Sequence, residues 1–233
     1  RDRARASWWA VGTRCCPSPT RGDTRAGWWS RTTGRRRSRP SPWCRRSSGS
    51  IPGNGYINVF YSGRGTVNGS EIHPDFGITQ TKGEWIILTE PGGNVVDSLK
   101  IIKVTQTNHS YGRTTDGATT WSLFLTPTVG VTNSGAKNYY TSKPVFSISP
   151  GFYPASQNVT ISTTDATATI YYTLDGTVPS TGSIVYSGPL AVAATSVIRA
   201  RAFSSDANTP ASFVETNTYF INSTHTLPVV SIC

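Results

Sequence analysis

Short stretches in which apolar and polar residues alternate follow one another from Tyr56 to Ile221. The run Ser196–Phe203 alternates throughout, as a strand with one buried face does. Further runs are rich in β-branched and aromatic residues and end at Gly, Pro or Asn, which is typical of strands separated by turns. They are Tyr56–Tyr61, Trp85–Leu88, Leu99–Val104, Thr119–Phe124, Val145–Ile148, Val159–Ser162, Thr169–Thr173, Val185–Tyr186 and Val214–Ile221. No helical period of useful length occurs, so the pattern predicts an all-β fold.

The turn signals divide this β region near Ser142-Lys143-Pro144. About seven short strands between Val145 and Ile221 are the number expected of one β-sandwich. We therefore expect a C-terminal sandwich module that is distinct from the β-rich segment before it.

The first 48 residues differ from the rest in composition. They contain 13 Arg and two Asp, a net charge of +11, whereas residues 49–233 contain nine basic and ten acidic side chains, a net of −1. They use ten residue types, all of which GC-rich codons can encode, and hold five of the seven Trp. One interpretation is an Arg/Trp-rich arm that contacts phosphates and stacks on bases. The other, which we favour, is GC-rich DNA read in a wrong frame, whose product is disordered because it lacks aliphatic core residues.

Several kinds of site are not indicated by the sequence. There is no run of 18 apolar residues, so we expect no membrane span, and no signal peptide is recognisable. Neither a P-loop nor a G-x-S-x-G elbow occurs. The cysteines and histidines lack zinc spacing; they are Cys15, Cys16, Cys44, Cys233, His73, His109 and His225. We expect no catalytic, metal or cofactor site and no nucleic-acid partner.

The C-terminal β region carries a long specific motif. It reads Ile170-Tyr171-Tyr172-Thr173-Leu174-Asp175-Gly176-Thr177-x-Pro179-Ser180, and continues as Ile198-Arg199-Ala200-Arg201-Ala202-Phe203 and Thr218-Tyr219-Phe220-Ile221. With Gly151-Phe152-Tyr153 before it, residues 143–221 resemble the chitobiase/β-hexosaminidase C-terminal-type repeat, also called the GH29D-like β-sandwich domain. The resemblance implies an immunoglobulin-like accessory module of extracellular bacterial proteins that is not itself catalytic.

Two further resemblances flank this module. His73-Pro74-Asp75-Phe76, Gly93-Asn94-Val95-Val96-Asp97-Ser98, Asp116-Gly117-x-x-x-Trp121 and Pro127-Thr128-Val129-Gly130 make residues 56–133 similar to the later part of a bacterial lamin-tail domain, whose opening half is missing. His225-Thr226-Leu227-Pro228-Val229-Val230-Ser231-Ile232 resembles the entry strand of a CotH-type (spore coat protein H) kinase domain. None of the kinase's catalytic residues falls within these eight positions.

These resemblances imply four segments and two immunoglobulin-like sandwich modules, the first of them truncated. We expect a disordered Arg-rich N-terminus at 1–50, a partial lamin-tail domain at 51–142, the GH29D-like sandwich at 143–222 and the start of a CotH-type domain at 223–233. Since its first strands are missing, the lamin-tail part should expose an unpaired sheet edge, unless residues 1–48 replace those strands.

Three residues are candidate ligand-facing positions. Tyr171 and Tyr172 point to opposite faces of one strand, so we expect one in the core and one able to stack on a sugar ring. Asp175 precedes Gly176 in a strong turn signal, and we expect the pair to act chiefly as a turn. Arg113 and Asp116 are interpreted likewise, as a local pair in a turn.

The resulting functional hypothesis is a set of non-catalytic spacer or interaction modules that present or dock a neighbouring domain of a secreted bacterial surface protein. The expected partners are the neighbouring domains of the parent chain and a cell-surface carbohydrate or protein. Two alternatives stay open: a carbohydrate-binding accessory module, and the N-terminal fragment of a CotH-type protein kinase. We expect an extracellular or cell-surface location for each of them.

Overall fold

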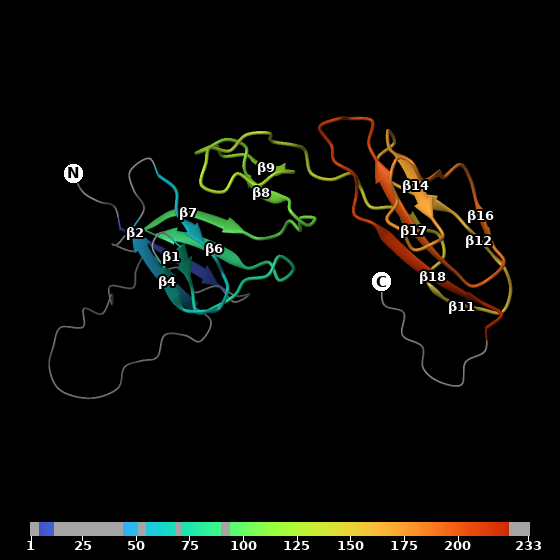
Figure 1. Ribbon diagram of the computed structural model, residues 1–233, viewed down its shortest axis with the longest axis horizontal. Helices are drawn as coiled ribbons and strands as arrows, with labels where there is room; N and C mark the ends of the chain where they lie inside the picture. Colours follow the sequence, from blue (N-terminus) through green and yellow to red (C-terminus); the bar gives the residue numbers. More distant parts are fainter. Residues whose placement is uncertain (1–4, 12–43, 51–54, 69–70, 90–93, 224–233) are drawn as a thin grey trace, which may run out of the picture. The chain divides into compact units, whose positions relative to one another are not determined.

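The computed structural model describes residues 5–11, 44–50, 55–68, 71–89 and 94–223, and their regular secondary structure is entirely β (Figure 1). The all-β prediction is therefore confirmed. The strands are β1 (Arg5–Val11), β2 (Cys44–Ser50), β3 (Asn58–Val59), β4 (Thr66–Asn68), β5 (Glu71–His73), β6 (Trp85–Thr89), β7 (Val95–Lys100), β8 (Ser110–Arg113), β9 (Trp121–Phe124), β10 (Val145–Phe146), β11 (Gly151–Tyr153), β12 (Gln157–Val159), β13 (Ile161–Ser162), β14 (Thr169–Thr173), β15 (Ile184–Val185), β16 (Leu190–Val192), β17 (Ser196–Phe203) and β18 (Glu215–Ile221).

The described residues form two compact units. The first contains the residues up to Thr105 together with Thr128–Thr132, and the second contains Gln106–Pro127 and the residues from Asn133 onward. A compact unit is defined by packing and need not coincide with a sequence module. The module limits at 51–142 and 143–222 therefore stay predictions, and so does the CotH-type segment at 223–233, of which only residue 223 is among those described.

The first unit holds two small sheets. One has the strand order β2-β1-β6-β7, and the other has the order β3-β5-β4, in which β3 runs parallel to β5. Ile72 of β5 and Phe76 are buried, and the ring of Tyr61 lies 5.7 Å from that of Phe76. These few buried apolar side chains make a small core.

The expectation that residues 1–50 are disordered throughout does not hold for β1 and β2. β1 pairs antiparallel with β6, from Ser7 opposite Thr89 to Val11 opposite Trp85, and β2 pairs with the other side of β1. The physical reason is that the edge of β6 offers unpaired backbone N–H and C=O groups to any extended segment. Whether these strands replace those of a lamin-tail domain stays a prediction. The rest of the Arg-rich segment lies outside the described residues.

The second unit contains a β-sandwich. A five-stranded sheet of order β11-β18-β17-β14-β15 packs against the antiparallel pairs β12-β16 and β10-β13. The strand β17 buries every second side chain, as its alternating sequence predicts. The core between the layers consists of Val159, Ile161, Ile170, Val192, Ile198, Ala200, Ala202, Tyr219 and Ile221.

Tyr219 is the largest fully buried side chain of this core. Its hydroxyl donates a hydrogen bond to the carbonyl of Ile148 at 2.8 Å and accepts one from Nδ2 of Asn217 at 3.1 Å. A buried phenol needs such partners, because an unpaired hydroxyl in an apolar interior is costly. The Tyr219 hydroxyl thus attaches the loop before β11 to the last strand.

A polar network attaches the segment before the sandwich to its outer sheet face. The side-chain amide of Gln106 donates to the carbonyl of Ala211 at 2.9 Å, and its oxygen accepts from Nη2 of Arg201 at 2.8 Å. The backbone N–H of Gln106 donates to the hydroxyl of Tyr140 at 2.9 Å, which lies 2.7 Å from Nδ1 of His109. Through this network, which we call the Gln106 junction, the segment of the β8–β9 hairpin belongs to the same unit as the sandwich.

The residues around the expected boundary are also packed. The backbone N–H of Thr141 donates to the carbonyl of Pro210 at 2.9 Å, Nζ of Lys143 lies 2.5 Å from Oε2 of Glu215, and Pro144 is fully buried. Ser142-Lys143-Pro144 is thus held against the sandwich along its length.

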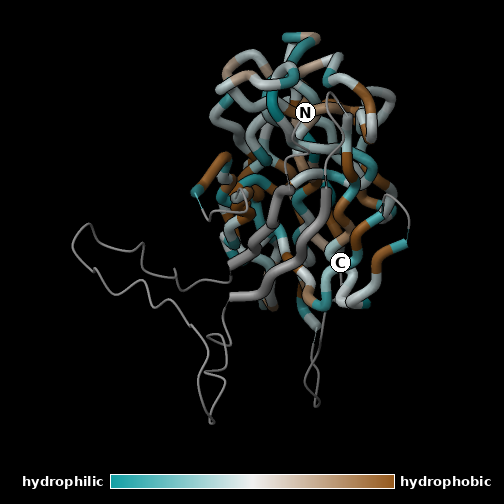
Figure 2. The backbone as a smooth tube through the Cα atoms, turned by 90° about the vertical axis from the view of Figure 1, so that its left-hand side faces the viewer, coloured by the Kyte–Doolittle hydropathy of each residue, from teal (hydrophilic) through white to brown (hydrophobic). Residues whose placement is uncertain are grey.

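Among the described residues, no helix is long and apolar enough to cross a membrane. In Figure 2, short apolar stretches alternate with polar ones along the residues that are coloured by hydropathy.

Candidate functional site

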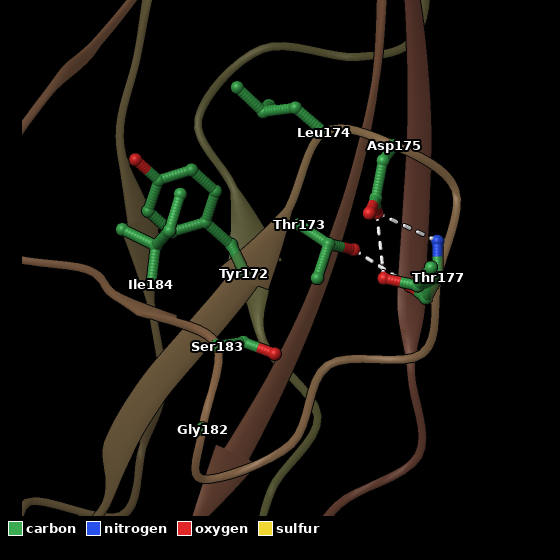
Figure 3. Close-up of a pocket in the computed structure, with 8 residues that line it drawn as sticks. All are labelled: Tyr172, Thr173, Leu174, Asp175, Thr177, Gly182, Ser183 and Ile184. Atoms are coloured by element: carbon green, nitrogen blue, oxygen red, sulfur yellow. Dashed lines mark hydrogen bonds between the residues drawn. The ribbon is translucent and has the colours of Figure 1, made fainter.

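A groove of about 470 Å³ lies beside the end of β14, in the connection to β15 (Figure 3). Its volume is within the range of about 300–1,000 Å³ that is common for small-molecule sites. The lining residues are Tyr172, Thr173, Leu174, Asp175, Thr177, Gly182, Ser183 and Ile184. Two of the three candidate ligand-facing residues, Tyr172 and Asp175, are among them.

Tyr171 and Tyr172 lie on opposite faces of β14, as the alternation of a strand requires. Tyr172 is half-buried, packs against the sandwich core with one side and lines the groove with the other. Tyr171 does not line the groove; its ring packs edge-on against Phe203 at 5.3 Å, on the outer face of the sheet. Of the two candidate tyrosines, Tyr172 is therefore the one that lines the groove.

Asp175 is held in a turn by its own neighbour. Its Oδ1 accepts hydrogen bonds from the backbone N–H of Thr177 at 3.0 Å and from the hydroxyl of Thr177 at 2.7 Å (Figure 3). These two bonds, the hydroxyl one first, lower the pKa of the Asp175 carboxyl below its usual range. Gly176 follows with a φ of 80°, so the turn signal is confirmed, although the loop to β15 is longer than a two-residue hairpin.

The same turn occurs at Asp165. Its Oδ1 accepts from the backbone N–H of Thr167 at 3.0 Å and from the hydroxyl of Thr167 at 2.7 Å. The turn geometry of Asp175 is therefore an ordinary structural device. What distinguishes Asp175 from Asp165 is its position in the wall of a groove. Because both hydrogen bonds from Thr177 go to Oδ1, the second oxygen of Asp175 is available as an acceptor.

The far wall of the groove was not anticipated from the sequence. Ile184 lies opposite Tyr172 in the β14–β15 ladder and is 56% exposed, and Leu174 is 54% exposed. The hydroxyl oxygen of Ser183 accepts a hydrogen bond from the backbone N–H of Ser180 at 3.0 Å, so its proton can be donated elsewhere. A prediction of strand pairing between residues 172 and 184 would have been needed to find these side chains.

A positive charge lies next to the Asp175 turn. Arg199 of β17 pairs with Thr173 of β14, and its Nη1 donates a 2.6 Å hydrogen bond to the carbonyl of Gly176. Its Nε is buried without a hydrogen-bond partner in the described part of the chain. The guanidinium thus helps to fix the turn.

The other polar residues that the sequence singled out do not converge on one place. His73 bonds through Nδ1 to the hydroxyl of Ser62 at 3.0 Å, and His109 belongs to the Gln106 junction; His225 lies outside the described residues. Arg113 donates to the carbonyl of Ala118 and lies 5.2 Å from the centre of the Trp121 ring. In the described ranges, no three His, Cys, Asp or Glu side chains are grouped so that they could hold a metal ion.

Comparison with known proteins shows that part of the second unit is similar to a known family. Residues 148–215 match the family model of the chitobiase/beta-hexosaminidase C-terminal domain. This confirms the resemblance of the C-terminal module. An endoglucanase of Clostridium saccharobutylicum is 38% identical to this chain over 72 residues, which are 31% of this chain and 15% of the endoglucanase. No solved structure matches the chain. The matching segment contains the groove, and the lamin-tail and CotH resemblances stay predictions.

Proposed function

We propose that this chain contributes non-catalytic accessory modules to a secreted bacterial protein, and that its sandwich acts as a firm support for the segment before it. The observation that carries the proposal is the Gln106 junction. A spacer must fix the orientation of the segment before it relative to its own sheet. Several part-buried hydrogen bonds fix that orientation better than a free linker does.

Two features of the second unit support this role. The junction residues Gln106 and Arg201 lie 95 positions apart, so their contact fixes a long-range arrangement. The family match also concerns a module that is named for its place at the C-terminus of glycoside-cleaving enzymes, which fits an accessory position beside another domain.

Two activities are proposed for the parent protein, and each is favoured by a different observation. The endoglucanase relative favours a parent that acts on a polysaccharide, whereas the CotH-type resemblance of residues 225–232 favours a surface protein kinase. The reading frame on both sides of these 233 codons, sequenced from genomic DNA, distinguishes a glycoside hydrolase domain from a kinase domain. The same sequence tests whether a frame change near codon 48 restores lamin-tail strands.

The support role itself is tested by hydrogen exchange on the full chain. The amide of Gln106 should exchange slowly, because it donates to Tyr140, and Arg201→Ala should accelerate exchange in the segment before the sandwich while the amides of β17 stay protected. Arg199→Ala is the matched control, since Arg199 lies on the same strand and bonds to Gly176 instead. Rapid exchange at Gln106 in the unmodified chain would refute the support role.

A further inference from the structure

We propose that the groove beside the end of β14 binds a neutral pyranose unit of an oligosaccharide, stacked against Tyr172 and hydrogen-bonded to Asp175 and Ser183. The support role described above needs no ligand, so this is a second activity at a separate place in the sandwich.

The walls of the groove provide the two kinds of surface that a sugar ring needs. One face of a pyranose carries C–H groups that pack on an aromatic ring or an aliphatic side chain. Tyr172 provides a ring that is held by the core, and Leu174 and Ile184, which line the same groove, provide exposed aliphatic surface (Figure 3). Because Tyr172 is already ordered by packing, little conformational entropy is lost when a ligand stacks on it.

The polar groups of the groove match hydroxyl groups. The second carboxylate oxygen of Asp175 can accept a hydrogen bond, the hydroxyl of Ser183 can donate one, and the hydroxyl of Tyr172 can do either. A vicinal pair of sugar hydroxyls offers one donor and one acceptor at neighbouring positions. The groove is thus complementary to a polyhydroxylated ligand more than to a purely apolar one.

The charges favour a neutral ligand. Asp175 is the single ionisable acid or base among the eight lining residues other than the tyrosine phenol, and its carboxylate is ionised near neutral pH, as an ordinary aspartate is. An acidic sugar would be repelled by this carboxylate. Because the carboxylate is exposed, solvent screens both this repulsion and the attraction of a cationic ligand, so the charge weakens acidic ligands modestly and gives cationic ones little affinity.

Two aromatic pairs of the sandwich, both at least partly exposed, favour a single sugar chain over a flat polysaccharide surface as the ligand. Phe152 and Phe220 stack ring on ring at 4.5 Å, and Tyr171 meets Phe203 edge-on. In neither pair are the two rings laid side by side as a flat platform. A groove beside one half-buried ring suits one sugar unit of a soluble chain.

The test is a titration of the ¹⁵N-labelled full chain followed by NMR. The probes are cellohexaose and chitohexaose, both neutral, and hexagalacturonate, an acidic chain of equal length. We expect at least one neutral probe to shift the amide signals of Gly176, Gly182 and Ser183 saturably, with a Kd of about 1 mM or tighter. Hexagalacturonate should bind more weakly than that neutral probe does.

Matched substitutions separate the groove from the rest of the sandwich. Asp175→Asn should weaken the neutral probe about tenfold and reduce the discrimination against hexagalacturonate. Asp165→Asn changes the same kind of turn outside the groove and should change neither property. Tyr172→Leu should weaken binding about tenfold, whereas Tyr171→Leu should not. Ser183→Ala removes a groove hydroxyl and changes no core side chain, so it should weaken binding of the neutral probe without affecting the core.

Three outcomes overturn the proposal: neither neutral probe shifts the groove amides, the acidic probe binds as well as the neutral ones, or Asp175→Asn and Ser183→Ala both bind as the unmodified chain does. None of these outcomes bears on the support role, which is read from the hydrogen exchange of Gln106.

Discussion

The guanidinium of Arg201 donates a 2.8 Å hydrogen bond to the side-chain oxygen of Gln106, which lies 95 positions earlier in the chain. The same guanidinium donates through Nε to the carbonyl of Ser212 at 2.9 Å. One strand of the sandwich therefore holds both the entering segment and a returning loop, and the stability of the second unit should depend on residues outside the matched family segment.

Replacement of Gln106 tests this dependence. Gln106→Ala removes one partner each from Arg201 and Ala211, so we expect the free energy of unfolding of the second unit to fall by about 1–3 kcal/mol. Urea denaturation followed by fluorescence measures the change. Gln157→Ala is the control, because Gln157 makes an exposed bond to Ala155 and should cost less than about 0.5 kcal/mol. Equal losses in the free energy of unfolding for the two variants would mean that the Gln106 junction stabilises the unit no more than an exposed hydrogen bond does.

The stability of the junction should depend on pH through His109. Burial, and secondarily the charge of Arg201, lower the pKa of His109 below its ordinary value of 6.5. The unfolded chain therefore binds a proton more readily than the folded chain as the pH falls. The stabilising contribution is complete above pH 6.5 and is lost as the pH falls through the folded pKa.

Unfolding curves between neutral pH and pH 5 measure this effect as the difference between the unmodified chain and His109→Gln, which keeps a polar group near the Tyr140 hydroxyl. The unmodified chain should lose more stability on acidification than the variant does. Identical slopes for the two proteins would contradict the prediction.

The hydroxyl of Tyr219 should contribute more to the free energy of unfolding than the hydroxyl of Tyr153 does. Tyr219→Phe leaves the carbonyl of Ile148 and the amide of Asn217 short of a partner inside the sandwich, and we expect a loss of about 1–2 kcal/mol. Tyr153→Phe removes an exposed bond to the carbonyl of Ser149 and should cost less than about 0.5 kcal/mol. Thermal unfolding of the two variants under one condition compares them directly.

The N-terminal strands should protect the first unit from proteolysis. Deletion of residues 1–50 uncovers the edge of β6 that β1 pairs with, so a protease should cleave the first unit faster while it cleaves the second unit at an unchanged rate. Timed digestion with mass spectrometry of the fragments measures both rates. Equal protection of the first unit with and without residues 1–50 would show that β1 and β2 add no stability.

The sequence predicted the long alternating strands well and the short ones poorly. The limits of β14 and β17 agree with the predicted runs Thr169–Thr173 and Ser196–Phe203, because each alternates over enough residues to define a period. The three-residue strands β11 and β16 were not predicted, since three residues cannot establish an alternation. The β segment expected from Val95-Val96 into Leu99–Val104 ends at Lys100 instead of Val104.

The groove was predicted in part for a similar reason. Tyr172 and Asp175 could be singled out because an aromatic strand and a turn dipeptide are local signals. Ser183 and Ile184 come from the other side of a loop, and their place beside Tyr172 depends on strand register, which no local pattern contains. β1 and β2 were not predicted, because backbone hydrogen bonding to an open sheet edge does not require a particular pattern of side chains.

The last strand of the sandwich, β18, is an interior strand. It runs parallel to β11 on one side and antiparallel to β17 on the other. A mechanical load applied at Ile221 along the strand axis must shear both ladders at once, whereas an edge strand would be peeled away one hydrogen bond at a time. The sandwich should therefore resist a pulling force on Ile221 better than a module whose last strand lies at a sheet edge.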